Sequence, residues 1–269
     1  MSLPIARRAV TARVRWFLGW SIGIVTFVAL TLGFYPAFEN ESTQMNDLFD
    51  NLPDSIKSLV GIGGGIDPFS SVGYLSSQIY ATLLPLLLIL ASVAIASSIA
   101  GDEEHGLLET SYSLPISRRR VLLERVIAAF AISVGLSVVA WAATAVTATA
   151  VGLDVGLGAM AWASVTLGIL ALAISAITVF VGALTGRKAV ALSVGSVAAI
   201  GGYLITSLAD ARIVFFEKIE FLSVFSLYDV LNVLVDSGPQ RSLFGLITVT
   251  VVFSAVAAVV IDHRDIRSA

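Results

Sequence analysis

Residues 75–100 read LSSQIYATLLPLLLILASVAIASSIA, a run of 26 residues that contains no Asp, Glu, Lys or Arg. A helix needs about 20 consecutive, mostly apolar residues to cross the hydrocarbon core of a membrane, and this run is long enough. Five further runs have the same character and cover about residues 16–38, 126–151, 160–185, 189–209 and 242–261. The sequence therefore predicts an all-α polytopic membrane protein, with six transmembrane helices in a single domain over residues 1–269.

The composition of the 269 residues supports this fold class, because 57% are hydrophobic and only 13% are charged. Soluble domains carry about 25% charged residues, so the chain lacks the charge that would cover a water-facing surface. We therefore do not expect a soluble enzyme. The chain has no cysteine, which excludes disulfides and thiolate metal sites. Its formal net charge of −3 is too small to indicate a nucleic-acid partner.

The basic residues indicate how the six helices are oriented. Twelve of the 16 Lys and Arg residues lie in the N-terminus, residues 101–125, the Arg187-Lys188 turn and the C-terminal tail. The other four lie in the alternate segments, residues 39–74, 152–159 and 210–241. Because positive residues concentrate in cytoplasmic loops, both termini are predicted to be cytoplasmic. The first run is too long for a secretory signal, so we expect a retained helix.

Two of the outer segments are predicted to contain short helices. In residues 45–60, apolar residues recur at helical spacing beside three Asp residues, which is typical of a helix at the membrane interface. A second region covers residues 213–235, in which residues 221–235 are apolar apart from Asp229 and Asn232. This stretch is too short for a span. We predict a re-entrant or interfacial segment, with an ordinary amphipathic loop helix as the alternative.

Several kinds of chemistry are disfavoured because their motifs are missing from the sequence. Residues 182–189, GALTGRKA, have the wrong spacing for a phosphate-binding P-loop, so the chain itself is not expected to bind ATP. His105 and His263 have no second histidine at metal-binding spacing, so no metal site is predicted. No charged residue falls inside the six runs, which disfavours a proton-coupled transporter. A sodium site built from hydroxyl groups and backbone carbonyls stays open.

Residues 101–125 hold the densest cluster of charge in the chain. An acidic block precedes a basic block: Asp102, Glu103, Glu104 and Glu109, then Arg118, Arg119, Arg120 and Arg125. Acidic residues favour the N-terminus of a helix, and Pro115 would end the short helix that they begin. Two interpretations remain. The segment is either a solvated loop that its arginines anchor at lipid headgroups, or a docking element for a cytoplasmic partner.

A motif in this segment favours the docking interpretation. Glu104-x-Gly106-x-x-Glu109 is followed by Leu114-Pro115-x-Ser117-Arg118 and then by an apolar helix. This pattern resembles the first cytoplasmic loop of ABC-2 type ABC transporter permeases, and it departs from that family at Leu107, where the family has Thr. In outline the resemblance covers the whole chain: a basic amphipathic stretch, six spans with both ends inside, and a large outer segment before the last span. The outer string Phe225-Ser-Leu-Tyr228-Asp is similar to an aromatic motif of the same permeases.

The resemblance implies that the work is divided between subunits. A separate ABC ATP-binding subunit, present in two copies, would bind ATP and Mg, so this chain would need no cofactor of its own. A second permease subunit, identical or related, would complete the transporter in a prokaryotic plasma membrane. The coupling helix that docks onto the ATP-binding subunit would cover residues 102–110, with contacts from Asp102, Glu103, Glu104, His105, Gly106, Leu107, Glu109 and Thr110.

The same resemblance implies a connecting helix over residues 6–15 along the inner membrane surface. Basic residues at that surface would contact lipid headgroups: Arg7, Arg8, Arg13, Arg15, Arg118, Arg119 and Arg120. Candidates for the transport pathway and its gating lie on the second and fifth spans: Thr82, Pro85, Ser92, Gly201, Gly202, Tyr203 and Thr206. Pro85 would permit a bend because it lacks a backbone N–H, whereas Ser and Thr in helices also bond to their own backbone.

The lack of charge along such a pathway favours a lipophilic or amphipathic cargo, such as a drug, an antibiotic or a lipid, over a small ion. By resemblance, the chain is expected to be the permease subunit of an ATP-driven exporter, with no catalytic residues of its own. The alternatives are an ion-coupled secondary transporter or channel without an ATPase partner, and a membrane-embedded accessory protein or enzyme.

Overall fold

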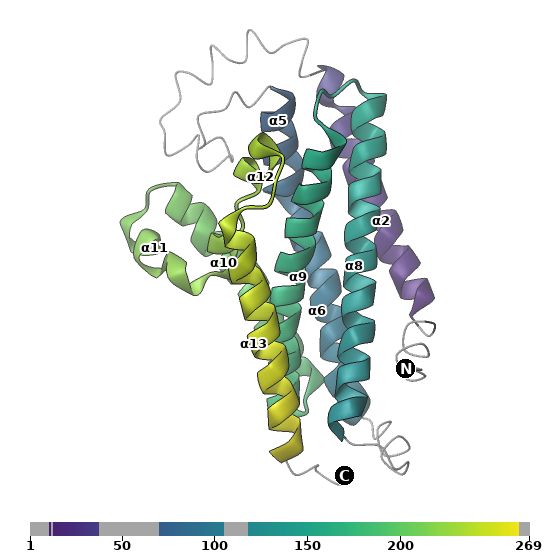
Figure 1. Cartoon of the computed structure of the whole chain (residues 1–269), viewed down its shortest axis with the longest axis vertical. Coiled ribbons are helices and arrows are strands. Elements are labelled where there is room, and N and C mark those ends of the chain that lie inside the picture. The colour runs from purple at the N-terminus through teal and green to yellow at the C-terminus, as the bar shows by residue number, and fades with distance from the viewer. Residues whose placement is uncertain (1–10, 12, 38–69, 105–117, 264–269) are drawn as a thin grey trace.

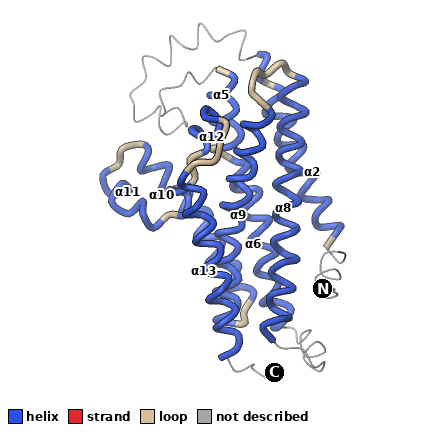
Figure 2. Tube along the Cα trace, in the orientation of Figure 1, coloured by secondary structure: helices blue, strands red, loops and turns tan. Residues whose placement is uncertain are grey.

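The computed structural model describes residue 11 and residues 13–37, 70–104 and 118–263. Six of its helices are long and apolar enough to cross a membrane. They are α2 (Val14–Gly33), α6 (Leu83–Glu104), α8 (Arg118–Ala150), α9 (Leu157–Thr185), α10 (Lys188–Asp210) and α13 (Arg241–His263). Figure 2 shows helices and connecting loops, and no strand, among the described residues. The prediction of an all-α polytopic membrane protein with six spans is confirmed.

The long helices form one elongated bundle (Figure 1). The beginning of α2 and the ends of α6 and α13 lie toward the bottom of that view, which we call the lower end of the bundle. In the most apolar stretches of α6 and α9, 67% of the residues are buried inside the chain, against 17–22% for α2, α10 and α13. The second and fourth spans therefore form the centre, and α2, α10 and α13 present apolar faces outward, as a lipid environment requires; α8, at 44%, is intermediate.

The fifth span packs very closely against the centre of the bundle. At Gly195, a Cβ atom would lie 2.2 Å from Thr178 Oγ1 of α9 and 2.7 Å from Val93 Cγ1 of α6. Both distances are shorter than a van der Waals contact, so only glycine fits between these two helices. Small residues commonly let membrane helices approach in this way, because van der Waals packing drives helix association in lipid.

Four of the described helices, α8, α9, α10 and α13, are longer than the charge-free runs that predicted them. The third span was expected to begin near residue 126, but α8 begins at Arg118. The fourth was expected near residue 160, and α9 begins at Leu157. The predicted boundary of the third span stops at Arg125, whereas α8 continues through its charged residues because long basic side chains are stable in the headgroup region.

The second span is irregular in its upper half. It consists of α5 (Ser71–Tyr74), the π-helix η1 (Leu75–Tyr80) and then α6, with Ala81 and Thr82 between the last two. The Ala81 N–H donates to Ser76 O at 2.8 Å, an i→i−5 bond that widens the helix. Pro85 contributes to the break because it has no N–H to donate to the carbonyl four residues earlier. The irregular stretch thus lies just before the proline at which a bend was expected.

Short helices fill the segment between α10 and α13. They are α11 (Val214–Ile219), the 3₁₀-helices η2 (Glu220–Leu222) and η3 (Val224–Leu227), and α12 (Val230–Asp236). The prediction of short helices in residues 213–235 is therefore confirmed. The other predicted outer helix, in residues 45–60, lies outside the described residues.

Candidate functional site

A single carboxylate joins three helices at the lower end of the bundle. Asp102 lies in the last turn of α6, and its Oδ2 atom accepts a hydrogen bond from Nη1 of Arg125 on α8. Arg13, which immediately precedes α2, places Nη2 3.7 Å from the same oxygen. Arg13 Nη2 also donates to Ser98 Oγ of α6 at 2.6 Å. The beginning of α2, the end of α6 and the first part of α8 are thus held together through Asp102.

The two arginines depend on this carboxylate electrostatically. Burial lowers the pKa of the Arg13 guanidinium below its ordinary value, Asp102 counteracts this effect, and the positive charge of Arg125 lowers the pKa further. A guanidinium stays protonated at neutral pH even so. Asp102 therefore offsets the repulsion between two positive groups whose side chains are 20% and 14% exposed.

A neighbouring carboxylate extends the contact to the fifth span. Glu104 Oε2 accepts a hydrogen bond from the backbone N–H of Lys188, the first residue of α10, at 3.1 Å. A carboxylate is favourable at this position because the first N–H groups of a helix lack partners within it and carry partial positive charge. The Lys188 side chain packs on Gly101, where a Cβ atom would lie 2.8 Å from Lys188 Cδ. We call Arg13, Asp102, Glu104, Arg125 and Lys188 the lower charge cluster.

The predicted coupling helix begins differently from expectation. It was expected to start at Asp102, but Asp102, Glu103 and Glu104 form the last turn of α6. Acidic residues are unfavourable at a helix C-terminus, and the contacts of the lower charge cluster compensate for that cost. The remaining residues of the predicted docking set, His105, Gly106, Leu107, Glu109 and Thr110, lie outside the described residues. The chain leaves the described structure at Glu104 and re-enters it at Arg118.

The residues predicted for the inner membrane surface are only partly described. Arg7 and Arg8 lie outside the described residues, and Arg118 begins α8. Arg15, Arg119 and Arg120 are exposed, as contact with lipid headgroups requires. The Nε atom of Arg120 lies 3.2 Å from Oε1 of Glu124, whose side chain is buried, so this arginine also neutralises an acidic group within the bundle.

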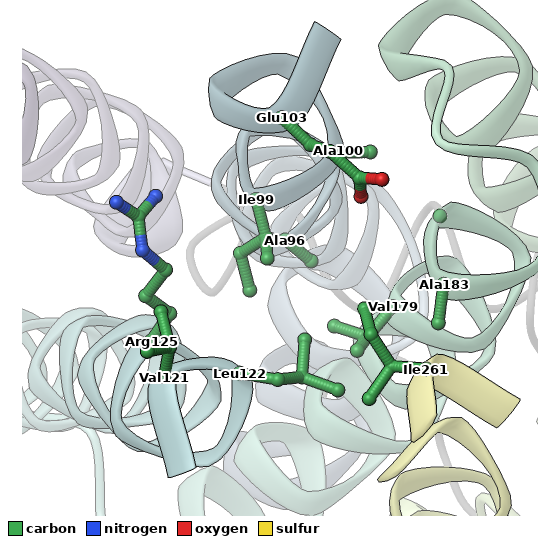
Figure 3. A pocket seen from close by; sticks show the side chains of 11 residues that line it. Ala96, Ile99, Ala100, Glu103, Val121, Leu122, Arg125, Val179, Ala183 and Ile261 are labelled. Atoms are coloured by element: carbon green, nitrogen blue, oxygen red, sulfur yellow. The ribbon is translucent and has the colours of Figure 1, made fainter. Parts of the chain in front are cut away.

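A small cavity lies beside the lower charge cluster, between α6, α8, α9 and α13 (Figure 3). Its lining is apolar apart from Glu103 and Arg125, whose charged groups point away from each other in Figure 3. The cavity measures about 10 Å³, the space that one water molecule needs. It is therefore too small to hold an organic substrate, which takes a pocket of at least about 300 Å³.

A larger groove runs between α8 and α9, and its volume is about 300 Å³. Its lining contains no charged residue: Val134, Ser137, Val138, Trp141, Ala161, Ser164, Val165, Gly168, Ile169 and Leu172. The two helices approach closely at its floor, because a Cβ at Gly168 would lie 2.7 Å from Ser137 Oγ. A groove of this size and character suits an alkyl or aromatic group.

The sequence of the chain matches the profile of the ABC-2 family of transporter proteins over residues 3–262. The chain belongs to this family. A search of curated proteins finds no significant match. With its six apolar helices, the chain is a multi-pass membrane protein and a permease subunit of ABC type, and the family implies a transporter system that includes an ATPase partner.

The pathway residues that the sequence predicts fall into two groups, one on the second span and one on the fifth span. On the second span, Ser92 is fully buried and donates to Leu88 O at 2.8 Å, Thr82 donates to Gln78 O at 2.8 Å, and Pro85 is buried. Both hydroxyls are thus bonded to their own helix backbone. The role of these three residues in a pathway stays a prediction.

The pathway candidates on the fifth span lie together near η3. Thr206 donates to Ser223 Oγ at 3.0 Å, and a Cβ at Gly202 would lie 3.1 Å from the same oxygen. The Tyr203 ring lies 5.8 Å from the ring of Phe225, edge to face. Gly201 has more space, since its nearest neighbour would be 3.9 Å from an added Cβ. Three of the four predicted residues, Gly202, Tyr203 and Thr206, therefore contact η3 or Ser223, which precedes it.

The predicted sites did not include several residues that join the helices of the permease. Three contacts link segments that are far apart in the sequence: Arg125 with Asp102, the Lys188 N–H with Glu104, and Tyr80 with Ser164. The one usable signal was the acidic block after a charge-free run, because acids at a helix C-terminus require basic partners. No sequence pattern indicates which basic residues those partners are.

Proposed function

We propose that the chain is the transmembrane permease subunit of an ATP-driven exporter of the ABC-2 type. It moves a lipophilic or amphipathic substrate, such as a drug, an antibiotic or a lipid, out across a prokaryotic plasma membrane. Two copies of a separate ABC ATP-binding subunit bind ATP and Mg, and a second permease subunit, identical or related, completes the pathway. The lower end of the bundle faces the cytoplasm, and both termini of the chain are cytoplasmic.

The observation that carries this proposal is the lower charge cluster, at the base of the predicted docking segment. Four helices are connected where the chain enters residues 105–117: Asp102 bonds to Arg125 of α8 and lies near Arg13, which precedes α2, and Glu104 bonds to the N-terminus of α10. A displacement of that segment is therefore transmitted to α2, α6, α8 and α10 together. A solvated loop with no partner would need no such connection.

The energetics of the proposed cycle follow from the two states of the ATP-binding subunits. ATP shifts the population of permease conformations only if the ATP-binding subunits hold it more tightly in one conformation than in the other. Closure of the two subunits on ATP displaces the docked segment, and the lower charge cluster passes the displacement to four spans. The cluster then acts as the mechanical link between hydrolysis and the pathway.

Two observations support a lipophilic or amphipathic cargo. Charged residues in the described long helices lie only near their ends, so the middle of the bundle offers no fixed charge to an ion. The groove between α8 and α9 is also free of charged residues and has room for an alkyl or aromatic group. The uncharged middle of the helices and the groove between α8 and α9 therefore suit a substrate that partitions into lipid.

The test is copurification with the ATP-binding subunit and measurement of substrate-stimulated ATP hydrolysis. Glu109→Ala and Glu104→Ala are expected to weaken docking and reduce the stimulation. Glu104→Gln keeps an oxygen that can accept from Lys188 N–H and removes only the charge, so it separates docking from the internal contact. Glu217→Ala, an exposed residue of α11, is the matched control and should leave both readouts unchanged.

Unchanged binding and unchanged stimulation in the Glu104 and Glu109 variants would show that docking occurs elsewhere. Transport that follows an ion gradient and needs no ATP would instead support the secondary transporter. Encapsulating ATP in liposomes that contain the complex, with and without an imposed ion gradient, distinguishes these outcomes.

A further inference from the structure

The segment between the fifth and sixth spans is bonded to the fifth span near the upper end of the bundle. We call residues 220–236 the upper strap; it contains η2, η3 and α12. Ser223 donates to the carbonyl of Gly202 at 2.9 Å and accepts from Thr206 at 3.0 Å. Its oxygen also accepts from the backbone N–H of Phe225 at 3.1 Å. One buried hydroxyl therefore fixes η3 against α10.

A second hydroxyl bonds the same strap to the second span. The Tyr228 hydroxyl donates to the backbone carbonyl of Tyr80 at 3.0 Å, across 148 positions of the sequence. Tyr80 is the last residue of the π-helix η1, and α6 begins only at Leu83. The strap thus contacts the second span at its one irregular point among the described residues. Short π-helices inside α-helices occur frequently at functional sites.

Tyr80 carries the connection further into the bundle. Its own hydroxyl is fully buried and lies 2.7 Å from Ser164 Oγ of α9. The Ser164 carbonyl accepts from Ser137 of α8 at 2.6 Å. A chain of neutral hydrogen bonds therefore connects the strap, η1, α9 and α8, and Ser137 and Ser164 also line the groove between α8 and α9.

We propose that Tyr228 is a positioning residue for transport: its hydroxyl makes the upper strap follow the second span when α6 moves. This inference rests on the proposed function, in which α6 is displaced from the lower charge cluster. α6 is continuous from Asp102 up to Leu83, and only Ala81 and Thr82 separate it from Tyr80, so its movement is passed to Tyr80 through two residues. The strap, held to α10 by Ser223 and to η1 by Tyr228, then opens or closes the upper end of the pathway in step with the second and fifth spans.

The bond has the strength that such a role requires. A single neutral hydrogen bond is worth about a fivefold change in an equilibrium between two conformations. The contact is therefore strong enough to keep the strap aligned with the second span and weak enough to break and re-form during a cycle. Removing the hydroxyl alone should separate the two motions without removing the packing of the ring.

The chain offers a clean experiment because it contains no cysteine. Two introduced cysteines can carry spin labels: Phe221→Cys on the strap, where the side chain is 78% exposed, and Gly158→Cys at the upper end of α9, where an added side chain meets open space. Distances between the labels are measured by pulsed electron resonance with Tyr228 intact and with Tyr228→Phe. The matched control is Ser226→Ala, which also removes a hydroxyl from the strap, but one that donates to the Ser223 carbonyl within the strap and not to a span.

Without nucleotide, we expect one dominant distance in the parent and in the Ser226→Ala variant. Tyr228→Phe should increase the population of a second distance about fivefold. Identical distributions in all three proteins would overturn the proposal. With the ATP-binding subunits and ATP, the parent distance should change and the Tyr228→Phe distance should not follow it. ATP could change no distance in the parent while the parent and the Tyr228→Phe variant still differ without nucleotide. That result would contradict the proposed function and would still support the contact between Tyr228 and the second span.

Amide hydrogen exchange of the unsubstituted chain gives a second measurement, in case Tyr228→Phe does not fold. If Tyr228 connects the strap to η1, the amides of Val224–Leu227 and Leu75–Tyr80 should open together, with protection that differs by less than about tenfold. Independent opening of the two segments would overturn the proposal as well.

Discussion

The lower end of the bundle is held by charged groups, whereas neutral hydroxyl groups hold the upper strap to the spans. At the lower end, Asp102 forms ion pairs with Arg13 and Arg125, and Glu104 accepts a hydrogen bond from the N-terminus of α10. In the upper strap, Ser223 and Tyr228 bond to backbone carbonyls of α10 and η1. Both arrangements link the second and fifth spans, so the same pair of helices is connected twice by different chemistry.

The ion pairs of the lower end and the neutral hydrogen bonds of the upper strap differ in strength, and each kind suits its place in the protein. Charged pairs at the lower end lie where the headgroup region and water stabilise ions, and they lose much when one partner is removed. Neutral hydrogen bonds can form deeper in the protein because they require no buried ion, and each contributes only about 1 kcal/mol. The lower end is thus suited to receive a large displacement, and the upper end to respond to it.

The largest expected effect comes from breaking the lower end. Asp102→Asn keeps the shape of the side chain and leaves Arg13 and Arg125 facing each other without a negative charge. We expect the free energy of unfolding to fall by about 2 to 3 kcal/mol, because both guanidiniums are mostly buried. Thermal unfolding of the purified chain measures it, and Glu217→Gln on α11 should change stability by less than about 0.5 kcal/mol. Equal stability of the two variants would contradict the role of Asp102.

A break midway between the two ends should have the next largest effect. Gly195→Ala places a Cβ 2.2 Å from Thr178 Oγ1 and 2.7 Å from Val93 Cγ1, so α10 must move away from α9 and α6. We expect a loss of about 2 kcal/mol from overpacking. Gly201→Ala, six positions later on the same helix, meets no atom closer than 3.9 Å and should be neutral or slightly stabilising. Chemical denaturation of the two variants in parallel is the measurement, and a neutral Gly195→Ala would refute the close packing.

The upper strap should yield a smaller effect. Ser223→Ala removes the bonds to Gly202, Thr206 and Phe225, and we expect the free energy of unfolding to fall by about 1.5 kcal/mol. Ser226→Ala is the matched control, because the hydroxyl of that exposed serine makes one bond among the described residues, to the carbonyl of Ser223. In thermal unfolding, the Ser223→Ala variant should have a clearly lower midpoint temperature than the Ser226→Ala variant. The reverse order would mean that Ser223 does not hold the strap.

Salt should produce the smallest effect and should distinguish the two ends. Raising the ionic strength from about 0.1 M to about 1 M shortens the Debye length from about 10 Å to about 3 Å. The penalty of Asp102→Asn should shrink by about 0.5 kcal/mol, because screening weakens the ion pairs of the parent and the repulsion in the variant. The penalty of Ser223→Ala should stay constant. A salt-independent Asp102→Asn penalty would show that the lower end is not held by charge.

The sequence predicted the number of spans because each span is a long run without charge, and such a run has no other stable place in a membrane protein. It located their ends less well, since helices such as α8 continue through charged residues at the headgroups. It also placed Asp102 at the start of a helix, where acids are favourable. The structure places this residue at the end of α6, where Arg13 and Arg125 offset the unfavourable position.

The contacts of the upper strap were harder to predict from the sequence than those of the lower end. Short helices could be predicted in residues 213–235 from their apolar character, but not the bond between Tyr228 and Tyr80. A tyrosine hydroxyl that donates to a backbone carbonyl 148 positions away requires no complementary residue type, so no pattern indicates the pair. The charged lower end was partly predictable for the opposite reason: uncompensated acids demand basic partners, even when their identity is unknown.

The central claim is that the lower charge cluster carries the motion of the ATP-binding subunits into the spans. It is tested most directly by the number of substrate molecules transported per ATP hydrolysed, in liposomes that contain the parent complex, the Asp102→Asn variant or the Glu217→Gln control. Below the unfolding temperature of the variant, we predict that Asp102→Asn still hydrolyses ATP and transports at least about fivefold less substrate per ATP. The control should match the parent. A transport-to-hydrolysis ratio for Asp102→Asn equal to that of the parent would contradict the claim.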